Sequence, residues 1–189
     1  MPDLGKVSSD ENWFTFKDFY KEAAKQPGYL TYVEVGVWKG NSVKFLAEEL
    51  KRSGKVFDLY AVDLWGDLGK ENPLWLERGN QIEEVYDTYR ENLRKAGVSG
   101  LVKDIIGQSA KAATLFQDES VDFCFIDADH RFNSVKADIE AWLPKIKKGG
   151  LLCGHDFRSQ GVFDAVNLVF LGKEIFAHHD QDVWVVQKD

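Results

Sequence analysis

Two short segments place ionisable side chains directly after apolar runs. VDFCFIDADH (residues 121–130) contains Asp127 and His130, and KKGGLLCGHDF (residues 147–157) contains His155 and Asp156. In open α/β sheets, ligands bind beyond the carboxyl ends of the strands, where loops surround a crevice. Carboxylates and imidazoles that meet there can hold a divalent metal and transfer a proton. The sequence therefore predicts that the chemistry takes place at these four residues.

Each of these side chains also has a structural interpretation. Asp127 could cap the helix that follows it, and His130 could be a surface imidazole at the start of that helix. His155 could equally be a ligand or a structural residue. Asp129 points to the opposite side from Asp127 if the strand continues, so it is left out of the predicted site.

A glycine-containing turn follows the first predicted strand. The segment EVGVWKGNS (residues 34–42) leads into a predicted helix. Gly36 and Gly40 would let the backbone approach a ligand closely, and the N–H groups of the helix N-terminus could bind carboxylate or phosphate oxygens. The spacing is not G-x-G-x-x-G, so the dinucleotide fingerprint is not met. A purely structural turn is the alternative.

Polar residues also end the next two predicted strands. Asp63 could accept hydrogen bonds from both hydroxyls of a ribose, or it could serve as a helix cap or a loop acid. The third strand ends in Gly107, Gln108 and Ser109, a combination that suits contact with an adenine edge. Ser109 is also a good helix N-cap, so this motif alone is weak.

Apolar periodicity predicts helices and strands in alternation. The connections between most strands are long enough for a helix, which requires parallel pairing, whereas the tight turn between the last two strands requires an antiparallel hairpin. We expect one domain over residues 1–189. The predicted helices cover residues 14–25, 41–52, 82–93, 110–116, 135–146 and 162–171, and the predicted strands cover residues 29–37, 56–64, 101–106, 121–126, 151–154, 174–178 and 183–187.

The composition is that of an ordinary soluble globular protein. Of the 189 residues, 44% are hydrophobic and 29% charged, and the net charge of −7 argues against a broad nucleic-acid surface. No apolar run approaches the roughly 20 residues of a membrane span, so a cytoplasmic location without membrane contact is expected by default. Cys124 and Cys153 lie in apolar runs and are predicted to be buried, reduced thiols. A homo-oligomer is left open.

Together, these motifs resemble the class I S-adenosylmethionine-dependent methyltransferases over nearly the whole chain. EVGVWKGNS matches the glycine motif, AVDLW the ribose acid and IIGQS the adenine loop, while IDADH and GGLLCGHDF match the ends of the fourth and fifth strands. The resemblance implies a Rossmann-like α/β sandwich with a mostly parallel seven-stranded sheet, in the order 3-2-1-4-5-7-6. It also implies the cofactor-binding residues Glu34, Gly36, Gly40, Asn41, Ser42, Asp63, Gly107, Gln108, Ser109 and Asp127.

Within this class, the fourth and fifth strand ends resemble a metal-dependent branch of small-molecule O-methyltransferases. They are similar to the macrolide-sugar enzymes and, more distantly, to the catechol and caffeoyl-CoA enzymes. In the latter group a lysine stands at the position of His130, and an Asp-Asn pair replaces Asp156-Phe157. In the sugar enzymes, an acidic residue commonly replaces His155.

The resemblance implies methyl transfer from S-adenosylmethionine to a small hydroxylated acceptor. Asp127, His155 and Asp156 would hold the divalent metal, and His130 would be the general base. Magnesium prefers oxygen ligands, so an imidazole in the set would favour manganese, iron or another transition ion.

Two other functions remain open at the level of sequence. The first is an NAD(P)-dependent oxidoreductase, which would share Asp63 and a glycine turn, and the second is a non-catalytic S-adenosylmethionine-binding protein. Residues 65–81 follow Asp63 directly and contain Trp65 and Trp75. They are predicted to form a lid over the cofactor, with an ordinary connection as the alternative.

Overall fold

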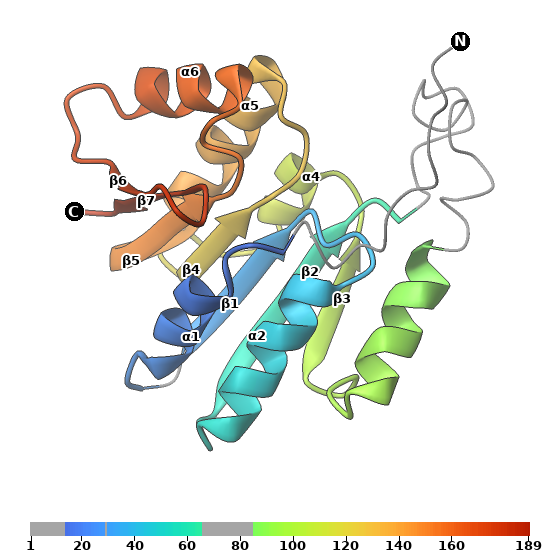
Figure 1. Ribbon diagram of the computed structural model, residues 1–189. Coiled ribbons are helices and arrows are strands. Elements are labelled where there is room, and N and C mark those ends of the chain that lie inside the picture. Colours follow the sequence, from blue (N-terminus) through green and yellow to red (C-terminus); the bar gives the residue numbers. More distant parts are fainter. Residues whose placement is uncertain (1–13, 29, 66–84) are drawn as a thin grey trace, which may run out of the picture.

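A computed structural model describes residues 14–28, 30–65 and 85–189 and contains a seven-stranded sheet (Figure 1). The sheet order is β3-β2-β1-β4-β5-β7-β6. Strands β1 to β5 pair in parallel, whereas β7 is antiparallel to both β5 and β6, as predicted. The bounds are β1 Leu30–Val35, β2 Phe57–Asp63, β3 Val102–Ile106, β4 Val121–Ile126, β5 Ile146–Gly154, β6 Phe176–His178 and β7 Val183–Gln187.

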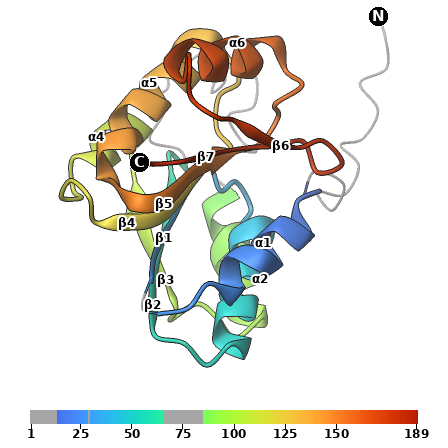
Figure 2. The same cartoon turned by 90° about the vertical axis from the view of Figure 1, so that its left-hand side faces the viewer.

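Helices cover both faces of this sheet. Figure 2 shows α1 and α2 on one face and α4, α5 and α6 on the other. Residues 85–95 are also helical and lie on the side of α1 and α2 (Figure 1). The bounds of the labelled helices are α1 Lys17–Lys25, α2 Asn41–Arg52, α4 Ser109–Ala113, α5 Phe132–Trp142 and α6 Gln160–Val169.

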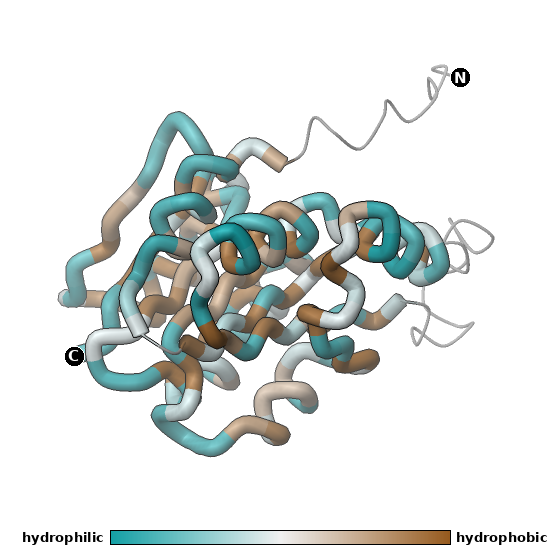
Figure 3. The backbone as a smooth tube through the Cα atoms, turned by 90° about the horizontal axis from the view of Figure 1, so that it is seen from below, coloured by the Kyte–Doolittle hydropathy of each residue, from teal (hydrophilic) through white to brown (hydrophobic). Residues whose placement is uncertain are grey.

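The sheet separates two hydrophobic cores. One includes Tyr20, Leu46 and Phe125, and the other includes Ile139, Leu152 and Trp184. Helix α2 could be predicted from its apolar pattern, because its buried residues recur at helical spacing: Val43, Leu46, Ala47 and Leu50. Along the backbone, hydrophobic and hydrophilic stretches alternate, as expected for elements with one buried face (Figure 3).

The connection between α5 and β5 differs from the prediction. The predicted helix continued to Ile146, but α5 ends at Trp142 and a 3-10 turn covers Leu143–Lys145. Pro144 lies in that turn and cannot donate a backbone hydrogen bond to continue an α-helix. Ile146 instead starts β5 and pairs with Val121, so the strand begins five residues earlier than predicted.

Gly149 and Gly150 were predicted to form the turn before β5, but they lie inside it. The register with β4 shifts between Val121 and Phe123, opposite these glycines. A Cβ on Gly150 would lie 2.9 Å from the carbonyl oxygen of Asp122, so glycine is needed for this close approach.

Two further expectations can be compared with the described residues. Cys124 and Cys153 are buried free thiols, as predicted. Across the described ranges, no helix combines the length and apolar character needed to cross a membrane. The predicted lid lies outside the described residues except for Trp65.

Candidate active site

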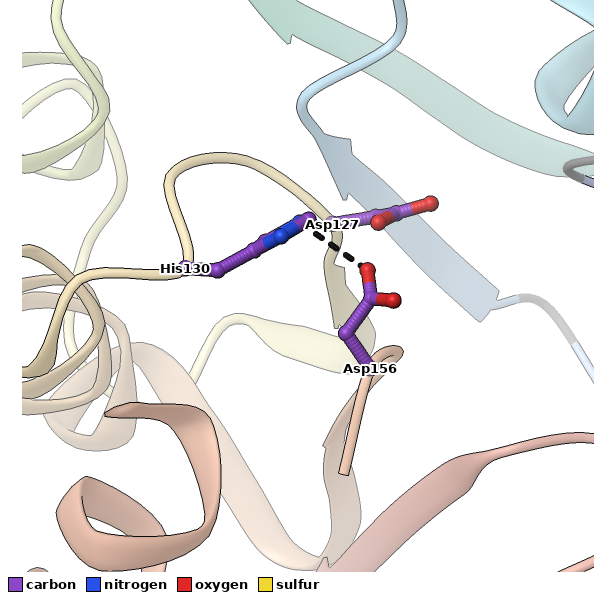
Figure 4. Close-up of side chains that lie close together, drawn as sticks. All are labelled: Asp127, His130 and Asp156. Atoms are coloured by element: carbon purple, nitrogen blue, oxygen red, sulfur yellow. Dashed lines mark ion pairs between the residues drawn. The ribbon is translucent and has the colours of Figure 1, made fainter. Parts of the chain in front are cut away.

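The carboxyl ends of β4 and β5 bring four ionisable side chains together, which we call the acid–imidazole cluster: Asp127, His130, His155 and Asp156. Figure 4 shows His130, Asp127 and Asp156 approaching one another from these two strand ends. His130 Nε2 lies 2.9 Å from Asp156 Oδ2. On the other side, His155 Nδ1 lies 3.2 Å from Asp156 Oδ2 and 3.8 Å from Asp127 Oδ1. The structure therefore brings together all four residues that the sequence singled out for chemistry.

Backbone geometry explains how these side chains converge. The amide of Asp127 donates to Val35 of β1 at 2.7 Å, and the amide of His155 donates to Ile126 of β4 at 3.1 Å, which fixes both strand ends. Asp156 has a φ of +56°, in the left-handed region that non-glycine residues rarely adopt. The unusual backbone at Asp156 directs the chain away from the sheet immediately after the cluster.

The start of α6 packs closely on the loop that carries His130. A Cβ on Gly161 would lie 2.3 Å from the carbonyl oxygen of His130, so a larger residue would push the helix away. Within the loop after β5, the amide of Ser159 donates to the carbonyl oxygen of Asp156 at 2.8 Å. The close approach of Gly161 to His130 thus places the start of α6 against the loop after β4.

The pKa values of the two carboxyl groups in the cluster shift in opposite directions. Burial raises the pKa of Asp127 to about 6, with His155 opposing the shift and Asp156 adding to it. Burial would also raise the pKa of Asp156, but hydrogen bonds from His130 and His155 outweigh burial and hold that pKa well below its usual range. Asp156 is therefore the carboxyl group of the pair that stays ionised.

Both imidazoles gain affinity for a proton. The hydrogen bond to Asp156 raises the pKa of His130, against the effect of partial burial. Burial lowers the pKa of His155, but Asp156 and Asp127 outweigh it and the net shift is upward. His130 has a side chain that is 49% exposed, compared with 11% for His155, so only His130 is readily accessible to an incoming molecule.

The donor atoms of the cluster fit a divalent cation. Asp127, His130 and Asp156 each offer one ligand atom, and these atoms lie within 4.8 Å of one another. Two ligands on opposite sides of one ion are separated by roughly 4–5 Å, so a common ion is geometrically compatible. A mixed set of carboxylates and imidazole suits manganese, iron or a similar transition ion better than magnesium.

A second set of predicted site residues lies at the ends of β1, β2 and β3, and we call it the glycine-loop half. Asp63 Oδ2 accepts hydrogen bonds from the amides of Val37 at 2.7 Å and Trp38 at 2.8 Å. Its Oδ1 accepts one from the amide of Trp65 at 3.1 Å. Asp63 therefore holds the loop after β1 in place, a role that its position in the sequence did not reveal.

Trp65 also helps to hold the loop after β1 in place. Its indole Nε1 donates to the carbonyl oxygen of Trp38 at 2.8 Å, and its ring stacks on Tyr89 with the centroids 4.5 Å apart. Only 8% of Trp65 is exposed. The first residue of the predicted lid is thus anchored in the core.

Glu34 is buried, with 1% exposed, although it was predicted to contact the cofactor. Its carboxylate accepts hydrogen bonds from Tyr20 Oη at 2.9 Å and from Ser42 Oγ at 2.5 Å. Burial raises the pKa of Glu34 to about 8, with both hydrogen bonds opposing the shift. Glu34 and Ser42 thus tie α1, β1 and α2 together, and a cofactor contact by either stays a prediction.

The glycines of the loop are required by packing. A Cβ on Gly36 would lie 2.1 Å from the carbonyl oxygen of Asp127, and one on Gly40 would lie 2.5 Å from the ring of Tyr89. Both glycines have φ near +80°, where other residues are strained. Gly36 therefore joins the glycine-loop half directly to the acid–imidazole cluster.

The predicted adenine loop lies beside Asp63, because the amide of Gly107 donates to the carbonyl oxygen of Asp63 at 3.0 Å. Gln108 is the N-cap of α4, with Ser109 as its first residue. Ser109 Oγ accepts from Trp142 Nε1 at 2.9 Å. The Ser109 hydroxyl is therefore engaged with α5. Asn41, also predicted to bind the cofactor, is the first residue of α2.

Sequence reasoning missed two neighbours of the cluster. Thr15, which precedes α1, lies 2.9 Å from His155 Nε2 through its Oγ1. Trp184 is 1% exposed and lines a small hollow together with Asp127, His130 and His155. Its indole nitrogen has no hydrogen-bond partner within the described ranges. Neither residue belongs to a local motif, because both reach the cluster from distant elements.

The chain also resembles known proteins. Residues 33–157 match the family described as "Methyltransferase domain". Among curated proteins, the uncharacterised protein y4gI of Sinorhizobium fredii (strain NBRC 101917 / NGR234) is 28% identical over 125 residues. That match covers 66% of this chain, but the chain spans only 13% of the relative's length.

Solved structures share the fold at low sequence identity. The O-methyltransferase NovP superposes with a TM-score of 0.68 at 19% identity, covering 92% of this chain and 79% of NovP. CalS11, a TDP-rhamnose 3'-O-methyltransferase of calicheamicin biosynthesis, superposes with a TM-score of 0.55 at 14% identity, covering 93% of this chain and 78% of CalS11. The family match covers most of this chain, and the sheet order agrees with it. The chain therefore belongs to the methyltransferase-domain family, with the class I, S-adenosylmethionine-dependent fold.

Proposed function

We propose that this chain transfers the methyl group of S-adenosylmethionine to a hydroxyl oxygen of a small molecule. The observation that carries this proposal is the acid–imidazole cluster, which lies next to the glycine loop at Gly36. A hydroxyl is a poor nucleophile while protonated, and the cluster supplies both a proton acceptor and cation ligands. The names of NovP and CalS11 as O-methyltransferases support an oxygen acceptor, and that of CalS11 favours a sugar hydroxyl.

The glycine-loop half would hold the methyl donor. Asp63 lies at the end of β2 beside Gly107, where a ribose could reach its remaining acceptor positions. Gln108 and Ser109 follow directly on β3, at the expected place of the adenine. The loop from Gly36 to Gly40 would face the amino-acid end of the donor, near the amino terminus of α2.

His130 would act as the general base. Its Nε2 is paired with Asp156 at 2.9 Å, so a neutral ring that donates from Nε2 offers its Nδ1 lone pair to the hydroxyl proton. The raised pKa of His130 makes it a stronger base than an isolated imidazole. The acceptor oxygen would attack the methyl carbon as the carbon–sulfur bond breaks, and His130 would keep the proton.

Asp127 and Asp156 would hold the divalent cation, and His155, whose Nδ1 faces both carboxylates, would be the third ligand in place of His130. When bound, such an ion lowers the pKa of a hydroxyl beside it. Asp127 and Asp156 would orient that hydroxyl toward His130, and the apolar residues around the cluster would exclude water. Manganese or iron fits this mixed donor set.

The test measures methyl transfer to a panel of hydroxylated acceptors, including nucleotide-linked deoxysugars and catechols, with and without Mn²⁺. Formation of S-adenosylhomocysteine together with a methyl ether is the expected result. Titrating S-adenosylhomocysteine and NADH separately tests the oxidoreductase alternative, which requires NADH to bind. A protein that binds S-adenosylhomocysteine but methylates no acceptor would support the non-catalytic alternative.

A further inference from the structure

The turn between β6 and β7 contacts the loop that follows the acid–imidazole cluster. The amide of Phe157 donates to the carbonyl oxygen of Asp182 at 3.3 Å, and the amide of Arg158 donates to Asp182 Oδ1 at 2.9 Å. The Arg158 guanidinium also donates to the carbonyl oxygen of His179. Asp182 therefore accepts hydrogen bonds from both amides that directly follow Asp156.

These two amides belong to a tight turn that starts at Asp156. The amide of Ser159 closes this turn by donating to the carbonyl oxygen of Asp156 at 2.8 Å. The φ of +56° at Asp156 lies in the left-handed region, where a residue with a Cβ is strained. Such a conformation persists only where the surrounding structure holds it. Asp182 supplies two of the contacts that do so, one through its backbone and one through its side chain.

The backbone at Asp156 sets the direction of its side chain. Asp156 Oδ2 lies 2.9 Å from His130 Nε2 and 3.2 Å from His155 Nδ1. Figure 4 shows the carboxylate directed at His130. Because a change in φ rotates the Cα–Cβ bond relative to β5, a relaxed turn would move the carboxylate away from the two imidazoles.

The turn between β6 and β7 is itself fixed to the start of α1. Gln181 Oε1 accepts a hydrogen bond from the amide of Phe19 at 2.9 Å. The side chain of Asp182 is largely buried, with 19% exposed. The oxygen that holds the turn at Asp156 is therefore itself held in place by the packing around it.

We propose that Asp182 is a positioning residue, which holds the turn at Asp156 and so keeps the Asp156 carboxylate between His130 and His155. Asp182 acts through its oxygen as a hydrogen-bond acceptor and takes no part in the reaction itself. This inference rests on the proposed function, because it assigns Asp182 a role in methyl transfer through Asp156.

The experiment compares Asp182→Gly, which removes the side-chain acceptor, with Asp182→Asn, whose amide oxygen can still accept from the Arg158 amide. Asp182 has a φ of +55°, which glycine and asparagine both tolerate, so neither variant adds backbone strain. Glu119→Gly is the matched control. Glu119 is also acidic and has a φ of +56°, but it precedes β4 and lies at the opposite end of that strand from the cluster.

Three measurements are made on each variant. Steady-state kinetics give kcat and the KM for the acceptor, and calorimetry gives the affinity for S-adenosylhomocysteine. Crystal structures give the φ of Asp156 and its distance from His130, and they need neither acceptor nor metal.

Asp182→Gly should lower kcat on the order of 10-fold or more, the scale of losing a group that orients a metal ligand. The affinity for S-adenosylhomocysteine should not change, because the glycine-loop half keeps its contacts. In the crystal structure, the Asp156 carboxylate should lie beyond hydrogen-bond distance of His130. Asp182→Asn and Glu119→Gly should match the wild type in all three measurements. If Asp182→Gly does not fold, Asp182→Ala compared with Glu119→Ala repeats the test.

An unchanged kcat in Asp182→Gly, or an Asp156 that stays in place, would overturn the proposal. A loss in Asp182→Asn as large as that in Asp182→Gly would also overturn it, because the charge would then matter rather than the acceptor. A wild-type protein that methylates no acceptor would overturn the proposed function instead. The crystal structures would then decide by themselves whether Asp182 positions Asp156.

Discussion

The two halves of this site differ in where their polar side chains direct their hydrogen bonds. In the glycine-loop half, Asp63 bonds to loop amides and Glu34 bonds to Tyr20 and Ser42, so the carboxylates are satisfied inside the protein. In the acid–imidazole cluster, Asp156 and its neighbours bond mainly to one another around a common point. A buried charge without a partner is costly. Carboxylates and imidazoles that face one another therefore favour binding of a cation or a proton between them.

Similar motifs at strand ends thus serve different purposes in this protein. The first half shapes the backbone of a binding loop, and the second concentrates reactive groups. Substitutions in the cluster should therefore impair chemistry more than folding. Substitutions in the glycine-loop half should impair both binding and folding.

The largest effect is expected for Asp156→Asn. It removes the anion that pairs with both His130 and His155, so metal-stimulated methyl transfer should be abolished. The affinity for S-adenosylhomocysteine should fall much less. Rates with and without Mn²⁺ and calorimetry of cofactor binding check this. Asp118→Asn, which removes a surface ion pair with Lys145, is the control. Full activity of Asp156→Asn would place the chemistry elsewhere.

Gly36→Ala tests the junction between the two halves. The new methyl group would lie 2.1 Å from the carbonyl oxygen of Asp127 at a φ of +84°. We expect the free energy of unfolding to fall by about 3 kcal/mol or more, from strain and overpacking together. Gly54→Ala is the matched control, because Gly54 has a similar φ of +69° but a Cβ added there would meet no atom within 4 Å. Urea unfolding of both variants measures the difference. Equal losses would show that the close contact at Gly36 does not matter.

His130→Asn tests the general base. The rate should fall on the order of 100-fold or more, the usual weight of such a residue, while cation and cofactor affinity persist. His179→Asn, an exposed histidine on the turn after β6, is the control. If His130→Asn instead loses Mn²⁺ affinity, His130 is a ligand and the base must be sought elsewhere.

Asp63→Ala tests whether Asp63, which holds the loop after β1 in place, also binds the cofactor. The affinity for S-adenosylhomocysteine should weaken by roughly 1–3 kcal/mol, the cost of losing charge-assisted hydrogen bonds. Because the amides of Val37 and Trp38 also lose their acceptor, the unfolding temperature should fall as well. Calorimetry and thermal unfolding check the two effects separately. A loss of stability with unchanged affinity would show that Asp63 only holds the loop and does not bind the cofactor.

A further effect concerns the pH dependence of stability. The pKa of Glu34 is about 8 in the folded protein, compared with 4.5 for an ordinary glutamate. Between these values the folded state binds more protons than the unfolded state, so the free energy of unfolding should decrease as pH rises. Glu34→Gln should remove this part of the decrease, whereas the exposed Glu22→Gln should not. Urea unfolding at several pH values measures it, and parallel curves for Glu34→Gln and wild type would contradict the prediction.

Much of the fold could be predicted because its determinants are local. Apolar spacing located α2 and β4 with the observed bounds, and the tight turn between β6 and β7 predicted their antiparallel pairing. The start of β5 could not be predicted, because Ile146 fits a helical stripe equally well. Its choice depends on pairing with Val121, twenty-five residues away.

The candidate site divides in the same way. The sequence alone determined that acids and imidazoles follow β4 and β5, since parallel strands must end at one edge of the sheet. Only the tertiary structure decided that Asp63 bonds to loop amides, that Glu34 is buried against Tyr20, and that Thr15 lies behind His155. Such contacts join residues far apart in the chain, so they arise from the packing of whole elements. No local pattern of residue types could encode them.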